Sequence, residues 1–442
     1  MNQMTTWSFR LAISIIATAP AVSNIWASQK NAKYTAAPLH STNAPCAVFY
    51  HLAGEGPKAQ LVGSDGKRFI FAAVDQVHYE GMFCEKLGYS PYGRTNARRH
   101  PDRESWRQET VGRLKSWGFN ALGANCCQTL RHRGLVYAYN LLIGERLCSG
   151  DPSRWISEFR NAPCTAFPDV FHPDFEAACE ARAREICEAL REERDLVGYF
   201  LDNELMWWGH PGGSCAEGMF EAVAALPEGR PAKNALRAFL AGRTPTPEVK
   251  LAFLAHCAER YFSVTTAAIR RHDPNHLILG CRVAGLDGVH DVVWKAMARH
   301  CDVISFNCYP WVDLASGRVY DREGGVPLDD RLKTLHRLTE RPLLVSEWGF
   351  RALDAGLPCT HGTGQIVKTQ RERACAAACT VRLLRSLPYL AGYSFFMWVD
   401  QPIYGFHEHN LEDSNYGLVN AEGQPYEELT SAFAREQITL PR

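Results

Sequence analysis

The chain has 442 residues, 46% of them hydrophobic, and its 48 Lys and Arg residues balance 48 Asp and Glu residues. This length can hold one large domain or two or three small ones, and the apolar content is ample for a large core. Because the charges balance and no basic block stands out, the composition argues against a nucleic-acid surface, which needs clustered Lys and Arg.

The first residues have the pattern of a secretory signal peptide. Arg10 precedes a mostly apolar run from Leu11 to Val22, and Ala27 could end a cleavage site. We therefore expect a signal peptide over residues 1–27, an N-terminal segment over 28–60, and a secreted or periplasmic mature protein. A disordered cytoplasmic leader is the alternative. No other apolar run reaches the roughly 18 residues needed to span a membrane.

The 16 cysteines do not have the spacing of a metal site, because no two of them form a C-x-x-C pair. Most fall inside predicted strands and helices, where a small buried thiol packs well. If the protein is exported, Cys148 and Cys164 are candidates for a disulfide, since they flank a loop rich in Pro, Ser and Asp.

Strand-like and helix-like segments alternate from about residue 69 to 435. A buried parallel strand reads as a continuous apolar run of about 4–8 residues, and eight segments fit: Phe69–Gln76, Phe119–Cys126, Val136–Ile143, Val197–Leu205, His276–Val283, Asp302–Pro310, Pro342–Phe350 and Leu390–Asp400. Helical patterns lie between most of them: Glu104–Trp117, Phe175–Glu193, Val249–Arg271, Asp291–Arg299, Asp330–Thr339, Gln370–Ser386 and Tyr426–Arg435.

This alternation predicts an α/β fold, a (β/α)8 TIM barrel over residues 61–436. An open doubly wound sheet is the alternative, but no G-x-G-x-x-G follows the first strand. Three intervals are long and carry Gly and Pro: after the third strand to about Pro173, after the fourth from Trp207 to Pro247, and after the sixth from Trp311 to Pro327. We interpret them as loop insertions after strands 3, 4 and 6 that shape a cleft.

Polar and aromatic side chains gather at the C-terminal ends of these strands, the face where barrel active sites lie. Glu204 ends the fourth strand and Glu347 the seventh, and two facing carboxyl groups are the minimum equipment for breaking a glycosidic bond. The other candidates are Asp75, Asn125, Asn203, Trp207, Trp208, Asn307, Tyr309, Trp348, Trp398 and Asp400. Each alone is more often a core, capping or ion-pair residue, and Asp75 could simply pair with Arg282. Their coincidence at several strand ends favours a site.

The arrangement resembles clan A of the glycoside hydrolases, which have a (β/α)8 barrel, an Asn-Glu pair after the fourth strand and a nucleophilic Glu after the seventh. Within the clan, the chain is similar to the β-agarase family in Gly198–Leu205 (GYFLDNEL), Asp273–Gly280 (DPNHLILG), Leu344–Phe350 (LVSEWGF), and Phe396–Pro402 (FMWVDQP) with Asn415–Val419 (NYGLV). Asp65–Ala124 resembles the first barrel unit more loosely.

The resemblance implies a role for each residue at these positions. Glu347 would be the nucleophile, Glu204 the acid/base, and Tyr309 a hydrogen-bond donor to Glu347. Asn203 would bind the sugar 2-hydroxyl, and Trp398 would form the floor of the cleaved sugar's subsite. Stacking or substrate contacts are expected at Trp207, Trp208, Trp348, Asp75, Asn125, Asn307 and Asp400. No metal or organic cofactor is implied.

The chain also departs from the family. The arginine that many clan A enzymes carry after the second strand is not evident, because Asn125 stands there. A separate N-terminal domain like that of larger agarases is not expected, since few residues separate the expected signal peptide from the first strand. The sequence thus favours a retaining β-glycosidase acting on a galactan-type polysaccharide or oligosaccharide. A β-galactosidase, mannanase or glucanase, an inactive glycan-binding barrel, and a metal-dependent barrel hydrolase are the alternatives.

Overall fold

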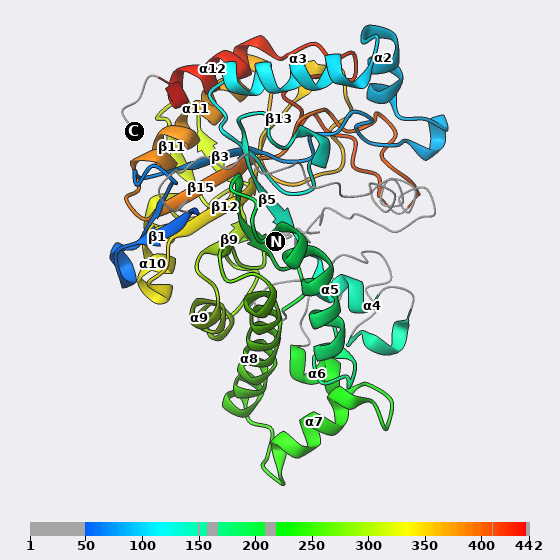
Figure 1. Ribbon diagram of the computed structural model, residues 1–442, viewed down its shortest axis with the longest axis vertical. Coiled ribbons are helices and arrows are strands. Elements are labelled where there is room, and N and C mark those ends of the chain that lie inside the picture. Colours follow the sequence, from blue (N-terminus) through cyan, green and yellow to red (C-terminus); the bar gives the residue numbers. More distant parts are fainter. Residues whose placement is uncertain (1–48, 149–150, 157–166, 208–217, 409, 439–442) are drawn as a thin grey trace, which may run out of the picture.

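The computed structural model describes residues 49–148, 151–156, 167–207, 218–408 and 410–438. At its centre is a curled nine-stranded parallel sheet with the order β7-β6-β5-β4-β3-β15-β12-β9-β8 (Figure 1). The strands are β3 (Phe71–Val74), β4 (Ala121–Leu122), β5 (Val136–Asn140), β6 (Leu196–Phe200), β7 (Leu277–Ile278), β8 (Val283–Ala284), β9 (Ile304–Asn307), β12 (Leu343–Trp348) and β15 (Leu390–Phe395). All eight predicted strands are therefore present, most of them shorter than expected.

The two edge strands of the sheet, β7 and β8, both come from the predicted fifth strand. They are separated at Arg282, whose φ of 48° lies in the left-handed region that interrupts a strand ladder. On one side of this segment, the Leu279 amide donates to the Tyr199 carbonyl at 2.8 Å; on the other, the Asp302 amide donates to the Ile278 carbonyl at 3.0 Å. The two edges of the curled sheet thus lie next to each other. A complete (β/α)8 barrel stays a prediction at this point.

Helices cover the outside of the sheet, with α11, α12 and α3 on one side and α5, α8 and α9 on the other (Figure 1). Their bounds match the predicted helices to within a few residues: α3 (Arg103–Ser116), α5 (Phe175–Leu190), α8 (Pro247–His272), α9 (Asp291–His300), α10 (Leu328–Thr339), α11 (Gln370–Ser386) and α12 (Glu427–Ile438). Side-chain capping explains where several of these helices begin. At α11, for example, the Thr369 hydroxyl accepts from the Glu372 amide, and the Glu372 carboxylate accepts from the Thr369 amide.

Apolar side chains fill both faces of the sheet. The larger cluster lies between the sheet and the helices and includes Leu122, Ile304 and Phe433. A smaller inner cluster takes alternate residues from the strands, among them Phe71 and Leu344, and it also holds Leu61 of an N-terminal hairpin. Side chains point alternately to opposite faces of a strand, so these two clusters mark the outer and inner faces of the curled sheet.

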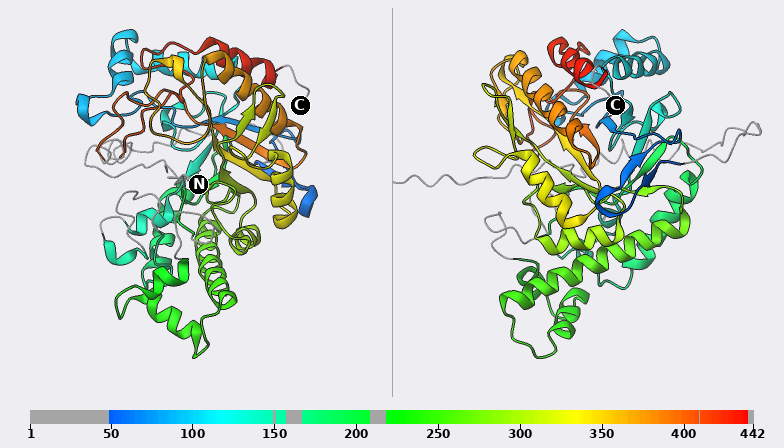
Figure 2. Two further views of the ribbon diagram at one scale, coloured as in Figure 1. Left: turned by 180° about the vertical axis from the view of Figure 1, so that it is seen from behind. Right: turned by 90° about the vertical axis from the view of Figure 1, so that its left-hand side faces the viewer.

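Further elements occupy the intervals between these strands and helices. They are the hairpin β1 (His51–Ala53) and β2 (Gln60–Val62), helices α2 (Pro91–Arg99), α4 (Ile143–Cys148), α6 (Met219–Ala224) and α7 (Pro231–Leu240), the hairpin β10 (Trp311–Asp313) and β11 (Arg318–Tyr320), and the parallel pair β13 (Arg351–Ala352) and β14 (Ile366–Val367). Figure 2 shows α6 and α7 at the far end of the molecule, beyond α8. Sequence patterns missed α2 and the β1–β2 hairpin, which spans the expected boundary at residue 60.

Several sequence expectations fall on residues that the structure does not describe. The expected signal peptide over residues 1–27, Trp208 and Cys164 all lie outside the described ranges, so the secretion signal and the Cys148–Cys164 disulfide stay predictions. Among the helices in those ranges, none combines the length and apolarity that a membrane crossing requires.

Candidate active site

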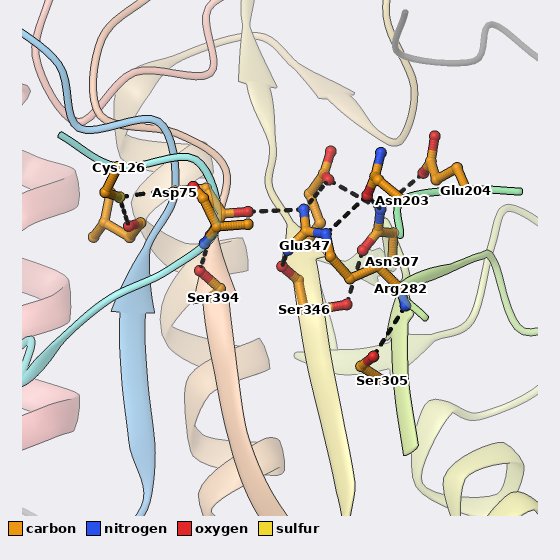
Figure 3. Close-up of polar contacts among 12 residues, drawn as sticks. Asp75, Cys126, Asn203, Glu204, Arg282, Ser305, Asn307, Ser346, Glu347 and Ser394 are labelled. Carbon is orange, nitrogen blue, oxygen red and sulfur yellow. Dashed lines mark hydrogen bonds and ion pairs between the residues drawn. The ribbon is translucent and has the colours of Figure 1, made fainter. Parts of the chain in front are cut away.

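The two predicted catalytic carboxylates meet at one amide nitrogen. Glu204 follows β6, Glu347 lies on β12, and Asn307 at the end of β9 is the cross-strand partner of Glu347. The Asn307 side-chain nitrogen donates to Glu204 Oε1 and to Glu347 Oε2, each at 2.9 Å (Figure 3). The two carboxylate oxygens are therefore separated by no more than twice that distance.

A hydrogen bond from Ser346 fixes the orientation of the Asn307 side-chain amide. Its carbonyl oxygen accepts a hydrogen bond from the Ser346 hydroxyl at 2.9 Å. The amide NH₂ therefore faces the two carboxylates, where it can only donate. The structure thus brings Asn307, predicted only as a substrate contact, between the two carboxylates.

Glu347 is 3% exposed and is surrounded by donors. Tyr309 donates its hydroxyl to Glu347 Oε1 at 2.6 Å, and Arg282 donates to Oε2 at 2.7 Å. Burial raises the pKa of Glu347; the Arg282 charge opposes this rise, and the Glu204 charge adds to it. The hydrogen bond predicted between Tyr309 and Glu347 is present.

Glu204 has fewer donors than Glu347. It is 6% exposed, and Asn307 is the donor that the described residues place on its carboxylate. Burial raises the pKa of Glu204, Asn307 and Arg282 oppose the rise, and the charge of Glu412 adds to it. Hydrogen bonds thus stabilise the charged form of Glu347 through three donors and that of Glu204 through one, while burial raises the pKa of both carboxyl groups.

Arg282 connects three of the side chains of the site by hydrogen bonds, although the sequence suggested only that it could pair with Asp75. It is 2% exposed. Its guanidinium donates to Asp75 Oδ2 at 3.0 Å and to Glu347 Oε2 at 2.7 Å, and its Nε donates to Asn203 Oδ1 at 2.8 Å. A planar fork of five N–H donors can serve these partners at once, as a Lys ammonium cannot. The pairing with Asp75 is confirmed, and Arg282 is also a site residue.

Asp75 and Asn203 differ in the hydrogen-bonding groups that they leave for a ligand. Asp75 is 1% exposed, and its carboxylate accepts bonds from Arg282, the Ala124 amide and the Ser394 hydroxyl. It therefore holds the arginine in place. Asn203 is half-buried, and its side-chain carbonyl oxygen accepts from Arg282. Its side-chain nitrogen points away from Arg282 (Figure 3). That nitrogen is placed to donate to a ligand.

The sugar-stacking roles expected for three tryptophans need correction, because their indoles lie in the outer core. Trp207 and Trp348 are 1% and 0% exposed, and Trp348 packs against the ring of Phe395. It follows Glu347 directly on β12, so alternation turns it to the outer face. Trp398 is 0% exposed, donates to the Tyr92 hydroxyl at 2.9 Å and stacks on Trp117. None of these three offers a free face to a sugar.

Two polar candidates lie away from the carboxylates. Both carboxylate oxygens of Asp400 are engaged: Oδ1 accepts from the Gly417 amide at 2.7 Å and from Asn415 at 2.8 Å, and Oδ2 accepts from the Tyr426 hydroxyl. Asp400 therefore anchors the segment after β15, which corrects its predicted role as a substrate contact. Asn125 is half-buried with a φ of 56°, and the described residues give it no hydrogen bond to the carboxylate network.

Sequence reasoning missed two other groups near the site. Phe396 packs edge-on against the rings of Tyr309 and Tyr416, with centroids 6.3 and 5.3 Å away. Glu412 is 5% exposed, accepts from Gln401 at 2.6 Å and raises the pKa of Glu204 through its charge. Strand alternation would turn Phe396 and Trp398 to the same face. Because β15 ends at Phe395, the alternation does not apply to these two residues, and they lie in different apolar clusters. Glu412 lies in an irregular segment without a pattern that could identify it.

The described ranges contain no group of three or more His, Cys, Asp or Glu side chains arranged to hold a metal ion. What the site offers is a pair of nearly buried carboxyl groups that share the Asn307 amide, with Arg282 bound to Glu347 alone of the two. Such a pair can supply one ionised and one protonated carboxyl group at the same pH.

Comparisons with known proteins point to one class of hydrolases. No protein-family model matches the chain. The sequence is similar to β-agarase A of Vibrio sp. (strain JT0107), with 27% identity over 398 residues that cover 81% of this chain and 38% of that protein. β-Agarase B of the same strain is 24% identical over 361 residues, which cover 74% of this chain and 35% of that protein. The chain thus spans well under half the length of either relative.

The fold is also similar to that of a solved agarase. The crystal structure of the agarase AgWH50C superposes with a TM-score of 0.72 at 22% sequence identity, over 95% of this chain and 68% of that one. At this identity the likeness shows the fold alone. The chain is therefore similar to β-agarases in sequence and to an agarase in its curled parallel sheet and surrounding helices.

Proposed function

We propose that this chain is a retaining glycoside hydrolase that cleaves a β-linked galactan-type polysaccharide or oligosaccharide, with Glu347 as nucleophile and Glu204 as acid/base. The observation that carries the proposal is the Asn307 nitrogen shared by both carboxylates at 2.9 Å. Retaining enzymes hold their carboxyl groups about 5–5.5 Å apart, and inverting ones about 6.5–9.5 Å. The shared nitrogen favours the shorter separation.

The donors around each carboxylate support this assignment of roles. Glu347 has Arg282, Tyr309 and Asn307 on its oxygens, and these three donors favour the ionised form that would attack the anomeric carbon. Glu204 keeps its proton, gives it to the leaving oxygen, and in the second step takes a proton from the water that hydrolyses the glycosyl-enzyme. The Asn203 nitrogen is placed to donate to the sugar 2-hydroxyl, a contact that strengthens in the transition state.

We also infer that the curled sheet is a (β/α)8 barrel of the clan A type, with its fifth strand split into β7 and β8. The neighbouring edges of the sheet and the inner cluster that joins residues of its strands support this inference. In such a barrel, the C-terminal strand ends form the active-site face. The described parts of the intervals expected as insertions would border that face and help select the substrate.

The substrate class rests on the sequence similarity to β-agarases. The same carboxylates would serve a β-galactosidase, a mannanase or a glucanase, and these stay alternatives. An inactive glycan-binding barrel would have no use for a nucleophile with three donors. The expected partner is thus a polysaccharide or oligosaccharide, met outside the cell if the N-terminal residues act as a signal peptide.

A substrate panel with product stereochemistry tests the proposal. The purified protein is incubated with agarose, other galactans, mannans and glucans, and with nitrophenyl β-glycosides. Product size is measured by chromatography, and the first-formed anomer by proton NMR. We expect cleavage of a galactan with the β anomer formed first. First formation of the α anomer would overturn the retaining mechanism, and cleavage of mannan or glucan alone would overturn the substrate.

A further inference from the structure

We propose that the segment of residues 362–365 is a positioning element that holds the Tyr309 hydroxyl against Glu347, and that the missing side chain of Gly364 sets the position of Tyr309. The inference rests on the proposed function, in which Tyr309 keeps the nucleophile ionised. The residues of the segment act through Tyr309 and are not themselves catalytic. No sequence pattern pointed to them.

Tyr309 lies outside the central sheet and needs support from other segments. Strand β9 ends at Asn307, and the Cys308 amide still donates to the Glu347 carbonyl at 2.8 Å. Tyr309 follows this bond, on the short link between β9 and β10. Its hydroxyl nevertheless reaches Glu347 Oε1 at 2.6 Å. A side chain on such a link keeps one position only if neighbouring segments hold it there.

Gly364 packs against Tyr309 so closely that a larger residue would displace the tyrosine. A β-carbon at position 364 would lie 2.8 Å from the Tyr309 β-carbon and 3.3 Å from its Cδ1. Carbon atoms pack best at about 3.5–4.0 Å, so such an atom must move Tyr309 or the segment. Gly364 also has a φ of 78°, a conformation that glycine adopts readily. Gly364 thus bounds the space that Tyr309 occupies.

Gln365 binds the chain three residues after Tyr309. It is 5% exposed, and its side-chain amide bonds to both backbone groups of Val312 on β10. The Gln365 nitrogen donates to the Val312 carbonyl, and the Gln365 oxygen accepts from the Val312 amide, each at 2.9 Å. This double bond pattern fixes the 362–365 segment relative to the link that carries Tyr309.

Two further side chains anchor the 362–365 segment. Arg351 on β13 is 5% exposed and donates to the Gly364 carbonyl at 2.8 Å. The Tyr416 hydroxyl accepts from the Thr363 amide at 2.7 Å and donates to the Thr363 carbonyl. The Tyr416 ring also packs edge-on against the Tyr309 ring, with centroids 5.8 Å apart. Tyr416 therefore contacts both Tyr309 and the segment that supports it.

Gly364→Ala tests the proposal, with Gly356→Ala as its matched control. Both glycines lie in the connection between β13 and β14 with a φ of 78°, but a β-carbon at Gly356 would meet no atom within 4 Å. The two variants therefore carry similar backbone strain and differ in the displacement of Tyr309. We expect kcat/KM of Gly364→Ala to fall by up to about 100-fold, with its acidic limb moved to higher pH as in Tyr309→Phe. Gly356→Ala should keep wild-type kinetics.

A double-mutant cycle separates an effect through Tyr309 from a general loss of structure. In a Tyr309→Phe background, Gly364→Ala should leave kcat/KM and the pH profile at their Tyr309→Phe values. Gln365→Leu removes both bonds to Val312 and should act in the same direction with a smaller loss, so it carries the same cycle if Gly364→Ala does not fold. Losses that simply add in the cycle, or variants with a wild-type pH profile, would overturn the proposal.

Fluorine NMR gives a second readout that needs no turnover. The chain is labelled with fluorotyrosine, and Tyr309→Phe identifies the Tyr309 resonance. Glu347→Gln should shift this resonance in the wild-type and Gly356→Ala proteins, and by much less in Gly364→Ala. A shift of equal size in Gly364→Ala would overturn the positioning role even if the chain hydrolyses glycosides. The expected pattern in a chain that cleaves no glycoside would support the positioning and overturn the proposed function alone.

Discussion

At the scale of single residues, the charge on Glu347 is controlled by the groups that touch its two oxygens. Tyr309 lies on Oε1, and Arg282 and Asn307 lie on Oε2. These contacts matter because the carboxylate is nearly buried, and in such surroundings each donor stabilises the charged form strongly. Changes to Tyr309 and to Arg282 should have different consequences, one for the reaction and one for the fold.

Tyr309→Phe should impair the reaction and leave the fold intact. The variant removes the 2.6 Å hydrogen bond to Glu347, so the pKa of Glu347 rises further above its usual value. Less of the nucleophile is ionised, and we expect kcat/KM to fall roughly 10- to 1,000-fold and the acidic limb of its pH profile to move to higher pH. The pH dependence of kcat/KM and the melting temperature measure both effects.

A matched control is Tyr393→Phe. The Tyr393 hydroxyl donates to Gln437 at 2.9 Å, on the outer side of β15. Its loss should leave the pH profile as it is. Wild-type kinetics in Tyr309→Phe would remove Tyr309 from the catalytic residues.

Arg282→Met should destabilise the fold in a pH-dependent way. Arg282 lowers the pKa values of Asp75 and Glu347 in the folded protein, against burial. Without it, both folded-state values lie further above those of the unfolded chain. The variant is therefore penalised least at acidic pH, where the carboxyl groups are protonated in both states, and its stability falls as the pH rises. Near neutral pH we expect a loss of about 3–5 kcal/mol.

Urea unfolding at several pH values measures this effect. Arg299→Met is the control, because Arg299 pairs with Glu259 on the surface with 55% of its side chain exposed. Its loss should be below about 1 kcal/mol. An Arg282→Met penalty that does not grow with pH would contradict the assigned ion pairs.

At the scale of elements, the strands end earlier than their apolar runs predict, and a residue with a left-handed backbone follows each of five strand ends within two to four residues. Gln76, Asn125, Leu142, Glu204 and Arg282 have φ values of 59°, 56°, 50°, 51° and 48°. These residues follow or interrupt five successive strands of the predicted series. Apolar runs locate a strand, but they do not show where its hydrogen-bonded ladder ends, so sequence reasoning found the strands and overestimated their lengths. Two of the five, Glu204 and Arg282, are site residues, and strained backbone is common at functional sites.

The order of strands and helices was predictable because alternating apolar runs and 3.6-residue periods are local signals. The burial of Trp207, Trp348 and Trp398 was not, because it depends on which face of a strand or loop meets the helices. Trp398 shows the difference: the backbone leaves the strand alternation after Phe395, and the indole packs on Trp117.

Trp398→Ala should therefore act on stability. A buried tryptophan that also loses a hydrogen bond to Tyr92 leaves a large cavity, and we expect a loss of about 3–5 kcal/mol in unfolding free energy. Trp398→Phe should lose less. Chemical unfolding and KM at a temperature where the variants are folded measure stability and binding separately. A variant with unchanged stability and lost binding would restore Trp398 as a substrate contact.

At the scale of the whole molecule, the curled sheet brings together residues that are far apart in the sequence. Asp75, Glu204, Arg282 and Glu347 come from four segments of the chain and are joined through Arg282 and Asn307. The meeting of the two carboxylates could be predicted because each glutamate lies at the end of a recognisable strand. The arginine network could not, because a pairing across the sheet interior has no local pattern in the sequence.

Chemical rescue of the nucleophile variant tests the central claim most directly. Glu347→Ala is assayed with an activated aryl β-glycoside of the preferred sugar in the presence of azide. Azide would occupy the space of the missing carboxylate and attack the anomeric carbon from the same side. We predict restored turnover with an α-glycosyl azide as product, and a β-glycosyl azide from Glu204→Ala under the same conditions. Formation of the β-glycosyl azide by Glu347→Ala would contradict Glu347 as the nucleophile.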